Sequence, residues 1–206
     1  MAPASKDAKT RLLDAAMAVI RTQGYAATSV DDLCRAAGVT KGAFFHHFPS
    51  KEDLGISAAA HFGAMADAVF AAAPYHALPD ARARVLGYVD FRRSILQGEL
   101  PDYTCLLGTL VQEAYASHPG IRAACEREIA GHAATLEGDI AAALAATGRE
   151  ADWTPASLAL HMQAVLQGAF VLAKATGGAR VAADSLDHLR RYLTFLFATD
   201  AREATS

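Results

Sequence analysis

Apolar residues recur at helical spacing along nearly the whole chain. Near the N-terminus, a helix is expected from about Lys6 to Gln23. Its apolar members lie three or four residues apart, which places them on one helical face: Leu13, Ala16, Met17 and Ile20. No segment shows the sustained two-residue alternation, rich in Val, Ile and Thr, that indicates a strand. The pattern therefore predicts an all-α protein.

Two short helices are expected before the first long one. Thr28 or Ser29 can cap the N-terminus of the first short helix, and Gly38 ends it. The second is predicted from Lys41 to Phe48, and a Pro-Ser pair separates it from a longer helix that begins at Lys51. Together with the N-terminal helix, these elements make a compact three-helix unit.

The chain divides into two predicted domains. Residues 1–54 form the three-helix unit, and residues 55–206 form a larger helical body in which Pro and Gly separate the helices. Helices are expected in the body at Asp80 to Gln97, Tyr103 to Ser117, Gly120 to Ala146, Pro155 to Thr176 and Ala182 to Phe197.

The last two predicted helices carry wide apolar faces. Such faces fit a four-helix bundle between two subunits, although they could also pack only within their own domain. The residues expected at a homodimer interface are Leu158, Met162, Val165, Ala169, Leu186, Leu189, Leu193 and Leu196.

Composition favours a folded cytoplasmic protein. With 206 residues, of which 52% are hydrophobic, the chain can bury a substantial core. We expect no secretory signal, because the longest apolar run near the start, Ala15 to Ile20, is too short. We expect no membrane span either, because charges such as Asp67 are expected to interrupt every span of membrane length. The three cysteines form no CxxC pair, and neither a disulfide nor a metal site or other cofactor is predicted.

Charge is distributed with a small asymmetry. Residues 1–54 hold seven Lys and Arg against six Asp and Glu, whereas the other 152 residues hold twelve basic and sixteen acidic side chains. The N-terminal domain is thus one charge positive and the body four charges negative, within a net charge of −3. A more positive N-terminal domain suits nucleic-acid binding, but a charge difference this small is weak evidence for it.

The two short helices match a helix-turn-helix over about residues 29–48, in which the second helix reads the major groove of double-stranded DNA. Phe44 and Phe48 lie one turn apart and are predicted to anchor that helix to the core. His46 and His47 are adjacent and diverge by about 100°, so they are not a metal pair. The side chains and backbone groups expected to touch DNA are Thr28, Ser29, Thr40, Lys41, Gly42, Ala43, Phe45, His46, His47 and Lys51.

Lys51 stands out because it falls in the first turn of a helix, where the helix dipole disfavours a cation. A DNA phosphate at that helix start would reverse the cost. Backbone amides there and near Ser29 are therefore candidate phosphate contacts at both ends of the motif.

Three sequence runs resemble the DNA-binding domain of the TetR family: Gly24 to Leu33 (GYAATSVDDL), Ala36 to Phe48 (AAGVTKGAFFHHF) and Ser50 to Leu54 (SKEDL). The resemblance implies a homeodomain-like helix-turn-helix and a homodimer on near-palindromic operator DNA. It also implies a helical body that binds a small effector. Many members carry tyrosine where this chain has Phe45 or His47.

A narrower resemblance concerns the body. The runs Thr104 to Glu113 and Gln167 to Lys174 look like the subgroup that includes the N-ethylmaleimide-responsive and acrylate-responsive repressors. That resemblance implies a sensor in which Cys105 lies near Lys174. Asp102 is a credible helix cap, which would place Cys105 in a first turn where amide dipoles favour the thiolate.

Structural roles for both sensor residues remain open. Cys105 can be a small buried residue, and Lys174, the only lysine after Lys51, can extend to the surface. Cys34 and Cys125 are expected to be structural.

The leading functional hypothesis is a repressor that releases its operator when an effector binds or modifies the body; the effector would be a reactive electrophile or a small unsaturated acid. One alternative is a non-covalent sensor in which Cys105 only packs. Another is an enzyme with Cys105 as nucleophile, although no His has motif-grade spacing to it. A helical scaffold that binds only protein would leave the outward basic residues of the motif unexplained.

Overall fold

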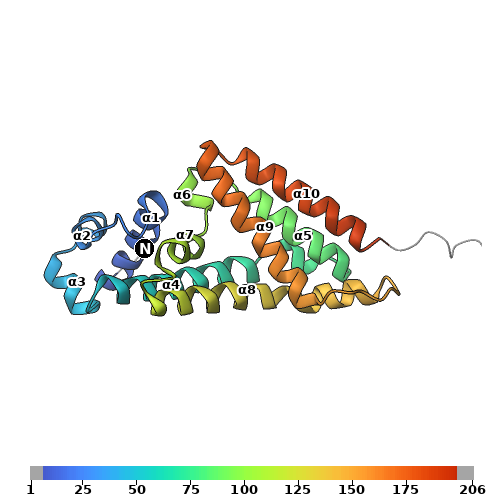
Figure 1. Ribbon diagram of the computed structural model, residues 1–206, viewed down its shortest axis with the longest axis horizontal. Coiled ribbons are helices and arrows are strands. Elements are labelled where there is room, and N and C mark those ends of the chain that lie inside the picture. Colours follow the sequence, from blue (N-terminus) through green and yellow to red (C-terminus); the bar gives the residue numbers. More distant parts are fainter. Residues whose placement is uncertain (1–6, 199–206) are drawn as a thin grey trace, which may run out of the picture. The chain divides into compact units, whose positions relative to one another are not determined.

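The computed structural model describes residues 7–198, and these residues form helices and no strands (Figure 1). The all-α prediction is confirmed. The predicted start of the first helix at Lys6 lies outside the described residues. In chain order, the elements are α1 (Ala8–Gln23), α2 (Val30–Ala37), α3 (Lys41–His47), α4 (Lys51–Ala71), the 3₁₀ helix η1 (Pro74–Ala77), α5 (Ala81–Ser94), α6 (Leu100–Tyr103), α7 (Leu106–Ala114), α8 (Pro119–Ala145), α9 (Pro155–Thr176) and α10 (Arg180–Leu196).

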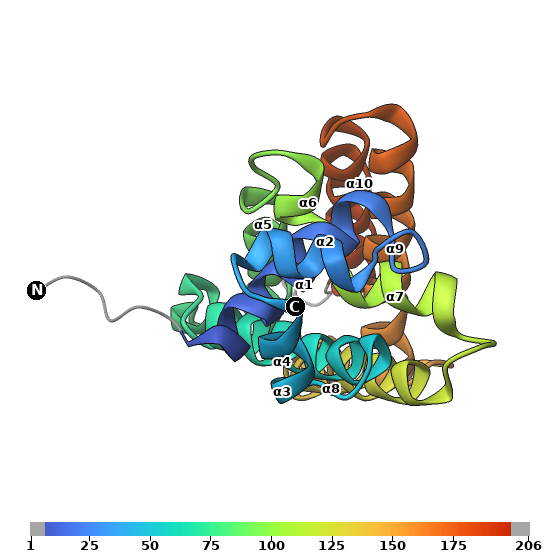
Figure 2. The same cartoon turned by 90° about the vertical axis from the view of Figure 1, so that its left-hand side faces the viewer.

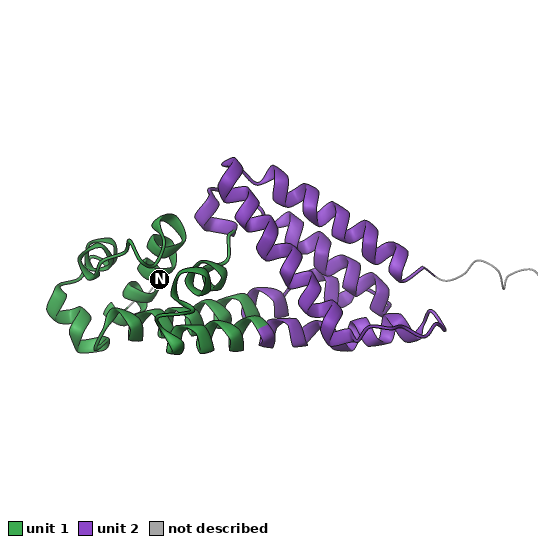
Figure 3. Ribbon diagram, viewed as in Figure 1, with its two compact units in different colours: residues 1–67, 104–129 green, residues 68–103, 130–206 purple. Residues whose placement is uncertain are grey.

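The chain folds as two compact units (Figure 3). Unit 1 joins the chain up to residue 67 with residues 104–129, and unit 2 joins residues 68–103 with the chain from residue 130 onward. This division differs from the predicted boundary at residue 54, because α7 and the first part of α8 pack with the N-terminal helices.

The core of unit 1 forms where α1, α2 and α3 meet (Figure 2). The apolar stripe of α1 supplies Leu12 and Ile20, α2 supplies Leu33, and α3 supplies Phe44, all fully buried. The leucines of α7, led by Leu110, complete this core. Non-local packing therefore ties α7 to the N-terminal helices.

Local signals fix the short helices. Ser29 caps α2 in a reciprocal box with Asp32, whose carboxylate accepts from the Ser29 backbone N–H at 3.0 Å. Gly38 ends α2 in the left-handed conformation at φ 62°, which side chains with a Cβ rarely adopt. The predicted cap and stop are both confirmed.

Unit 2 is a bundle in which α10 packs on α9 and α5. Two ion pairs join α5 to α10: Arg93–Asp187 at 2.7 Å and Arg190–Asp90 at 2.6 Å. The largest fully buried side chains of this unit are Tyr88, Ile140, Met162 and Phe197. Helix α9 has the predicted bounds.

The helix predicted from Tyr103 to Ser117 is wrong in its first part. The chain forms the single-turn helix α6, breaks, and restarts as α7 with Cys105 as the N-cap residue. Asp102 does not cap that helix, because its carboxylate accepts from the Glu99 backbone N–H at 2.8 Å.

The predicted dimer residues are also corrected. The side chains of six of them are buried within this chain and therefore are not available to a second copy: Leu158, Met162, Ala169, Leu186, Leu189 and Leu193. Val165 and Leu196 are half-buried. The strongest apolar stripes of α9 and α10 thus build the core of unit 2.

Two described helices are long and apolar enough to span a membrane by length and composition alone: Lys51–Ala77 and Pro155–Thr176. The expectation that charges interrupt every such span is therefore wrong, since residues 155–173 of α9 contain no Asp, Glu, Lys or Arg. A core helix of a bundle meets the same criteria, and α9 fills that role here through its buried residues.

Candidate nucleic-acid interface

The turn between α2 and α3 is held by backbone hydrogen bonds. Beyond the left-handed Gly38, the Val39 N–H donates to the Cys34 carbonyl at 3.0 Å. Thr40 then caps α3, its hydroxyl accepting from the Ala43 N–H at 3.1 Å. This is the arrangement of a helix-turn-helix.

Two phenylalanines anchor α3 from its inner side. Phe44 is 0% exposed and Phe48 is 2% exposed, and their ring centroids lie 5.9 Å apart. The predicted anchoring is confirmed. Burial of one face fixes which side of the helix can meet a ligand.

The outer face of α3 is open. Lys41, Gly42, Phe45 and His46 are exposed, and the Phe45 side chain is 53% exposed although it is large and apolar. An exposed phenylalanine beside a cation and an imidazole can contact sugars, thymine methyl groups or base edges. The neighbouring Ala43 and His47 are partly buried.

Lys41 has a protein partner on α2. Its ammonium lies 2.8 Å from the Asp31 carboxylate, and both side chains are more than half exposed. Such an exposed pair contributes little to stability. A phosphate can therefore take the place of Asp31 at small cost.

The N-terminus of α2 at Ser29 was predicted to bind a DNA phosphate, but its polar groups are engaged within the protein. Thr28 is 1% exposed and its hydroxyl donates to the Gly24 carbonyl, so its side chain positions the turn and is not available for a DNA contact. Ser29 is exposed, but its hydroxyl and amide are both engaged by the Asp32 carboxylate. The Asp32 carboxylate thus supplies, at the N-terminus of α2, the negative charge that a DNA phosphate was expected to supply.

Lys51 is also satisfied within the protein. Its ammonium donates to the Tyr25 carbonyl at 3.0 Å and the Thr28 carbonyl at 2.9 Å, and lies 4.3 Å from the centroid of the Tyr25 ring. Burial lowers the pKa of this lysine. The structure therefore explains the cation in the first turn of α4 without a phosphate, as a bridge to the turn before α2.

The contacts between α7 and the N-terminal helices could not be found from sequence. The Glu113 carboxylate of α7 accepts from the Ala26 N–H at 2.8 Å, and it lies where a side chain at Gly24 would have to fit. At the other end of α7, Arg21 donates to the Thr104 carbonyl at 3.4 Å. These partners are more than eighty residues apart, and no local pattern indicates them.

The predicted sensor residues fall in different units. Cys105, in unit 1, is partly buried against the core. Lys174, in unit 2, is exposed in the last turn of α9, where the helix dipole favours a cation. Their pairing stays a prediction.

The other two cysteines are buried, as expected of structural residues. Burial raises the pKa of the Cys34 thiol, and it raises the pKa of the Cys125 thiol to about 12. Over residues 7–198 there is no group of three or more His, Cys, Asp or Glu that could hold a metal ion.

Two family models match this chain. Residues 12–58 match the bacterial regulatory proteins of the tetR family, and residues 81–189 match the tetracyclin repressor-like C-terminal domain. The second match alone covers more than half of the sequence.

Curated relatives match in the N-terminal region. The chain is 48% identical over 44 residues to the HTH-type transcriptional regulator CymR of Pseudomonas putida, which is 21% of this chain and 22% of CymR. It is 38% identical over 50 residues to AcrR of Shigella flexneri, which is 24% of this chain and 23% of AcrR. The matches thus span under a quarter of the length of these relatives.

Solved structures share the whole fold. The crystal structure of reduced NemR from E. coli aligns with a TM-score of 0.76 and 21% identity, over 90% of this chain and 96% of NemR. This likeness shows a shared fold, and the two family models show the class: the chain belongs to the TetR family of helix-turn-helix transcriptional regulators.

Proposed function

We propose that this protein is a homodimeric repressor that binds a near-palindromic operator through α3 and releases it when a small effector binds unit 2. The observation that carries the proposal is the contrast between the two faces of α3. Its inner face is fixed by buried phenylalanines, and its outer face presents Lys41, Phe45 and His46. The regulatory names of the relatives support a regulator over an enzyme.

Binding of the purified protein to the DNA upstream of its own gene tests this proposal. Fluorescence anisotropy should show nanomolar-range binding at low salt, with an affinity that falls as salt is raised because phosphate contacts release counterions. Binding that is absent at low salt, or independent of salt, would contradict operator recognition.

A second copy would have to use the side chains that α9 and α10 leave exposed. On α9 these include Leu160, Val171 and Leu172, and on α10 Tyr192 and Phe195, the latter 81% exposed. Exposed apolar residues in this number on two adjacent helices are typical of a subunit interface. We therefore place the dimer contact on this face, in place of the buried residues that the sequence indicated.

Phe195→Glu is expected to convert the dimer to monomers, because it places a charge in an apolar interface. Analytical ultracentrifugation at micromolar concentration measures the change. Leu78→Glu is a matched control, since Leu78 is also exposed, at 38%, but lies outside α9 and α10. Equal dimer fractions in the wild type and in Phe195→Glu would rule out this interface.

Cys105 stays the candidate for an electrophile sensor, as the N-cap residue of α7, a helix that contacts α1. Cys105→Ser should keep operator affinity and lose release by N-ethylmaleimide, while Cys34→Ser should keep both. Operator release by N-ethylmaleimide at the wild-type rate in Cys105→Ser would assign Cys105 a packing role only.

A further inference from the structure

The turn between α1 and α2, residues 24–28, is held by a carboxylate from outside the helix-turn-helix. Glu113, near the end of α7, accepts a hydrogen bond from the Ala26 backbone N–H at 2.8 Å. Gly24 has a φ of 88°, and a Cβ at this position would collide with the same carboxylate. The glycine therefore serves two purposes: it allows the left-handed backbone, and it leaves the space through which Glu113 reaches the turn.

Lys51 of α4 holds the same turn with the opposite charge. Its ammonium donates to the carbonyls of Tyr25 and Thr28, at 3.0 and 2.9 Å. Burial lowers the pKa of Lys51, and the negative charge of Glu113 opposes this effect. The carboxylate thus binds an amide of the turn, the ammonium binds two of its carbonyls, and the two charges attract each other.

The position of this turn determines where the reading helix lies. Helix α2 begins at Val30, directly after its cap Ser29 and two residues after the turn. The Val39 N–H donates to the Cys34 carbonyl at 3.0 Å, which ties the linker before α3 to the end of α2. A displacement of the turn is therefore passed to α2 and through it to α3.

Two different segments of the chain hold the turn. Helix α4 passes from unit 1 into unit 2 after residue 67, and α7 begins three residues after the unit 2 segment that ends at Tyr103 (Figure 3). Helix α7 is fixed in the core of unit 1 by Leu106 and Leu110, both 0% exposed. Glu113 itself is exposed, so its replacement opens no cavity in that core.

We propose that Glu113 is a positioning residue for operator binding, which holds the α1–α2 turn and thereby the orientation of α3 in each protomer. This proposal rests on the proposed function, because it assumes a homodimer on a near-palindromic operator. Two reading helices must enter major grooves separated by about one helical turn or a multiple of it. An orientation fixed at the turn should therefore appear as a preference for one half-site spacing. A contact that only stabilises the fold would not change that preference.

Amide hydrogen exchange of the full chain, followed by NMR, tests the contact without DNA. The Ala26 N–H should exchange at least fivefold faster in Glu113→Ala, and also in Glu113→Met, which keeps a long side chain without an acceptor. Glu113→Gln should keep most of the protection, because its amide oxygen can still accept from Ala26. Exchange of Ala26 at the wild-type rate in both Glu113→Ala and Glu113→Met would overturn the proposal.

Fluorescence anisotropy tests the effect on recognition. The probes are the DNA upstream of the gene and two copies with one base pair inserted or deleted between the half-sites. Glu113→Ala and Glu113→Met should bind the natural spacing at least tenfold more weakly, because the dimer contains the contact twice. Their ratio of affinities for natural over altered spacing should fall at least threefold. Glu113→Gln should stay within threefold of wild type. The slope of log affinity against log salt should not change, since no phosphate contact is removed.

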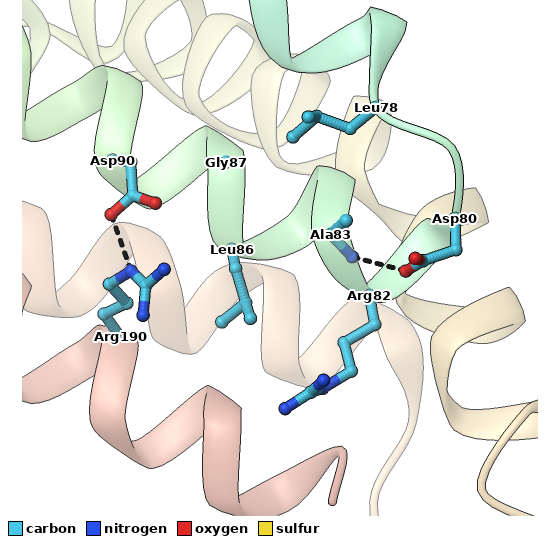
Figure 4. A pocket seen from close by; sticks show the side chains of 8 residues that line it. All are labelled: Leu78, Asp80, Arg82, Ala83, Leu86, Gly87, Asp90 and Arg190. Atoms are coloured by element: carbon cyan, nitrogen blue, oxygen red, sulfur yellow. Dashed lines mark hydrogen bonds and ion pairs between the residues drawn. The ribbon is translucent and has the colours of Figure 1, made fainter.

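Asp80 provides the matched control in unit 2. Its carboxylate also accepts from a backbone N–H, that of Ala83 at 2.7 Å, and caps α5. The residue lines a cavity of about 250 Å³ between α5 and α10 (Figure 4). Asp80→Ala should lower the melting temperature through loss of the cap and leave operator affinity and spacing preference unchanged.

Several binding results would overturn the proposal: unchanged affinity in Glu113→Ala and Glu113→Met, weaker binding with the wild-type spacing preference, equal losses in Glu113→Gln and Glu113→Ala, or an equal change of preference in Asp80→Ala. Circular dichroism of each variant checks its fold, and Glu113→Met gives the test if Glu113→Ala does not fold. Absent operator binding by the wild type would instead refute the proposed function, and the exchange rate of Ala26 separates that failure from loss of the contact.

Discussion

Phe44→Ala is expected to destabilise the N-terminal helices by about 3–5 kcal/mol, the cost of removing a fully buried aromatic ring. The ring fills the space between α3 and the core, and it contacts both Phe45 and Phe48 edge-on or tilted. Its loss leaves a cavity that the short helix α3 cannot close without moving. Because α3 is then not held in place, operator binding should be lost with the stability.

Urea denaturation followed by circular dichroism measures this effect. Phe45→Ala is the matched control, because it removes the same side chain one residue further on, from an exposed position. Its stability should change by no more than about 0.5 kcal/mol. Equal destabilisation by the two substitutions would show that α3 is not oriented as described.

The triple substitution Lys41→Ala, Phe45→Ala and His46→Ala is expected to weaken operator binding at least a hundredfold while the protein stays folded. These side chains are exposed on one face of α3, and each base-edge or phosphate contact contributes about 1–3 kcal/mol. Loss of the Lys41 contact should also reduce the slope of log affinity against log salt by about one for each protomer.

Anisotropy titrations of wild type and variant measure both quantities. The control is Arg82→Ala with Arg122→Ala, which removes two exposed basic residues outside α3. If that variant loses as much affinity as the triple variant, bulk charge and not the face of α3 determines binding.

How well the sequence predicts a feature of this structure depends on how far apart in the chain the interacting residues lie. The cap at Ser29, the stop at Gly38 and the anchor Phe44 act within one or two turns, and local pattern located them correctly. The phosphate role of Lys51 rested on the same local reasoning. That reasoning missed the Tyr25 and Thr28 carbonyls, which accept hydrogen bonds from Lys51 although they lie more than twenty residues away in the chain.

The dimer face shows a second limit. Periodicity correctly found apolar stripes on α9 and α10, but it does not say what covers them. The most regular stripe, which includes Met162 and Leu193, became the core of unit 2. The side chains left exposed, such as Leu172 and Phe195, are less regular in the sequence and stand out only when burial is known.

Protection of guanine N7 from dimethyl sulfate tests the central claim most directly, because N7 faces the major groove into which α3 is proposed to insert. On DNA upstream of the gene, the wild-type protein should protect guanines in two half-sites related by a near-palindrome, with centres about one helical turn or a multiple apart. The triple variant of α3 should give no protection at equal concentration. Bound DNA with unprotected guanines in both half-sites, or protection that persists in the triple variant, would contradict recognition by α3.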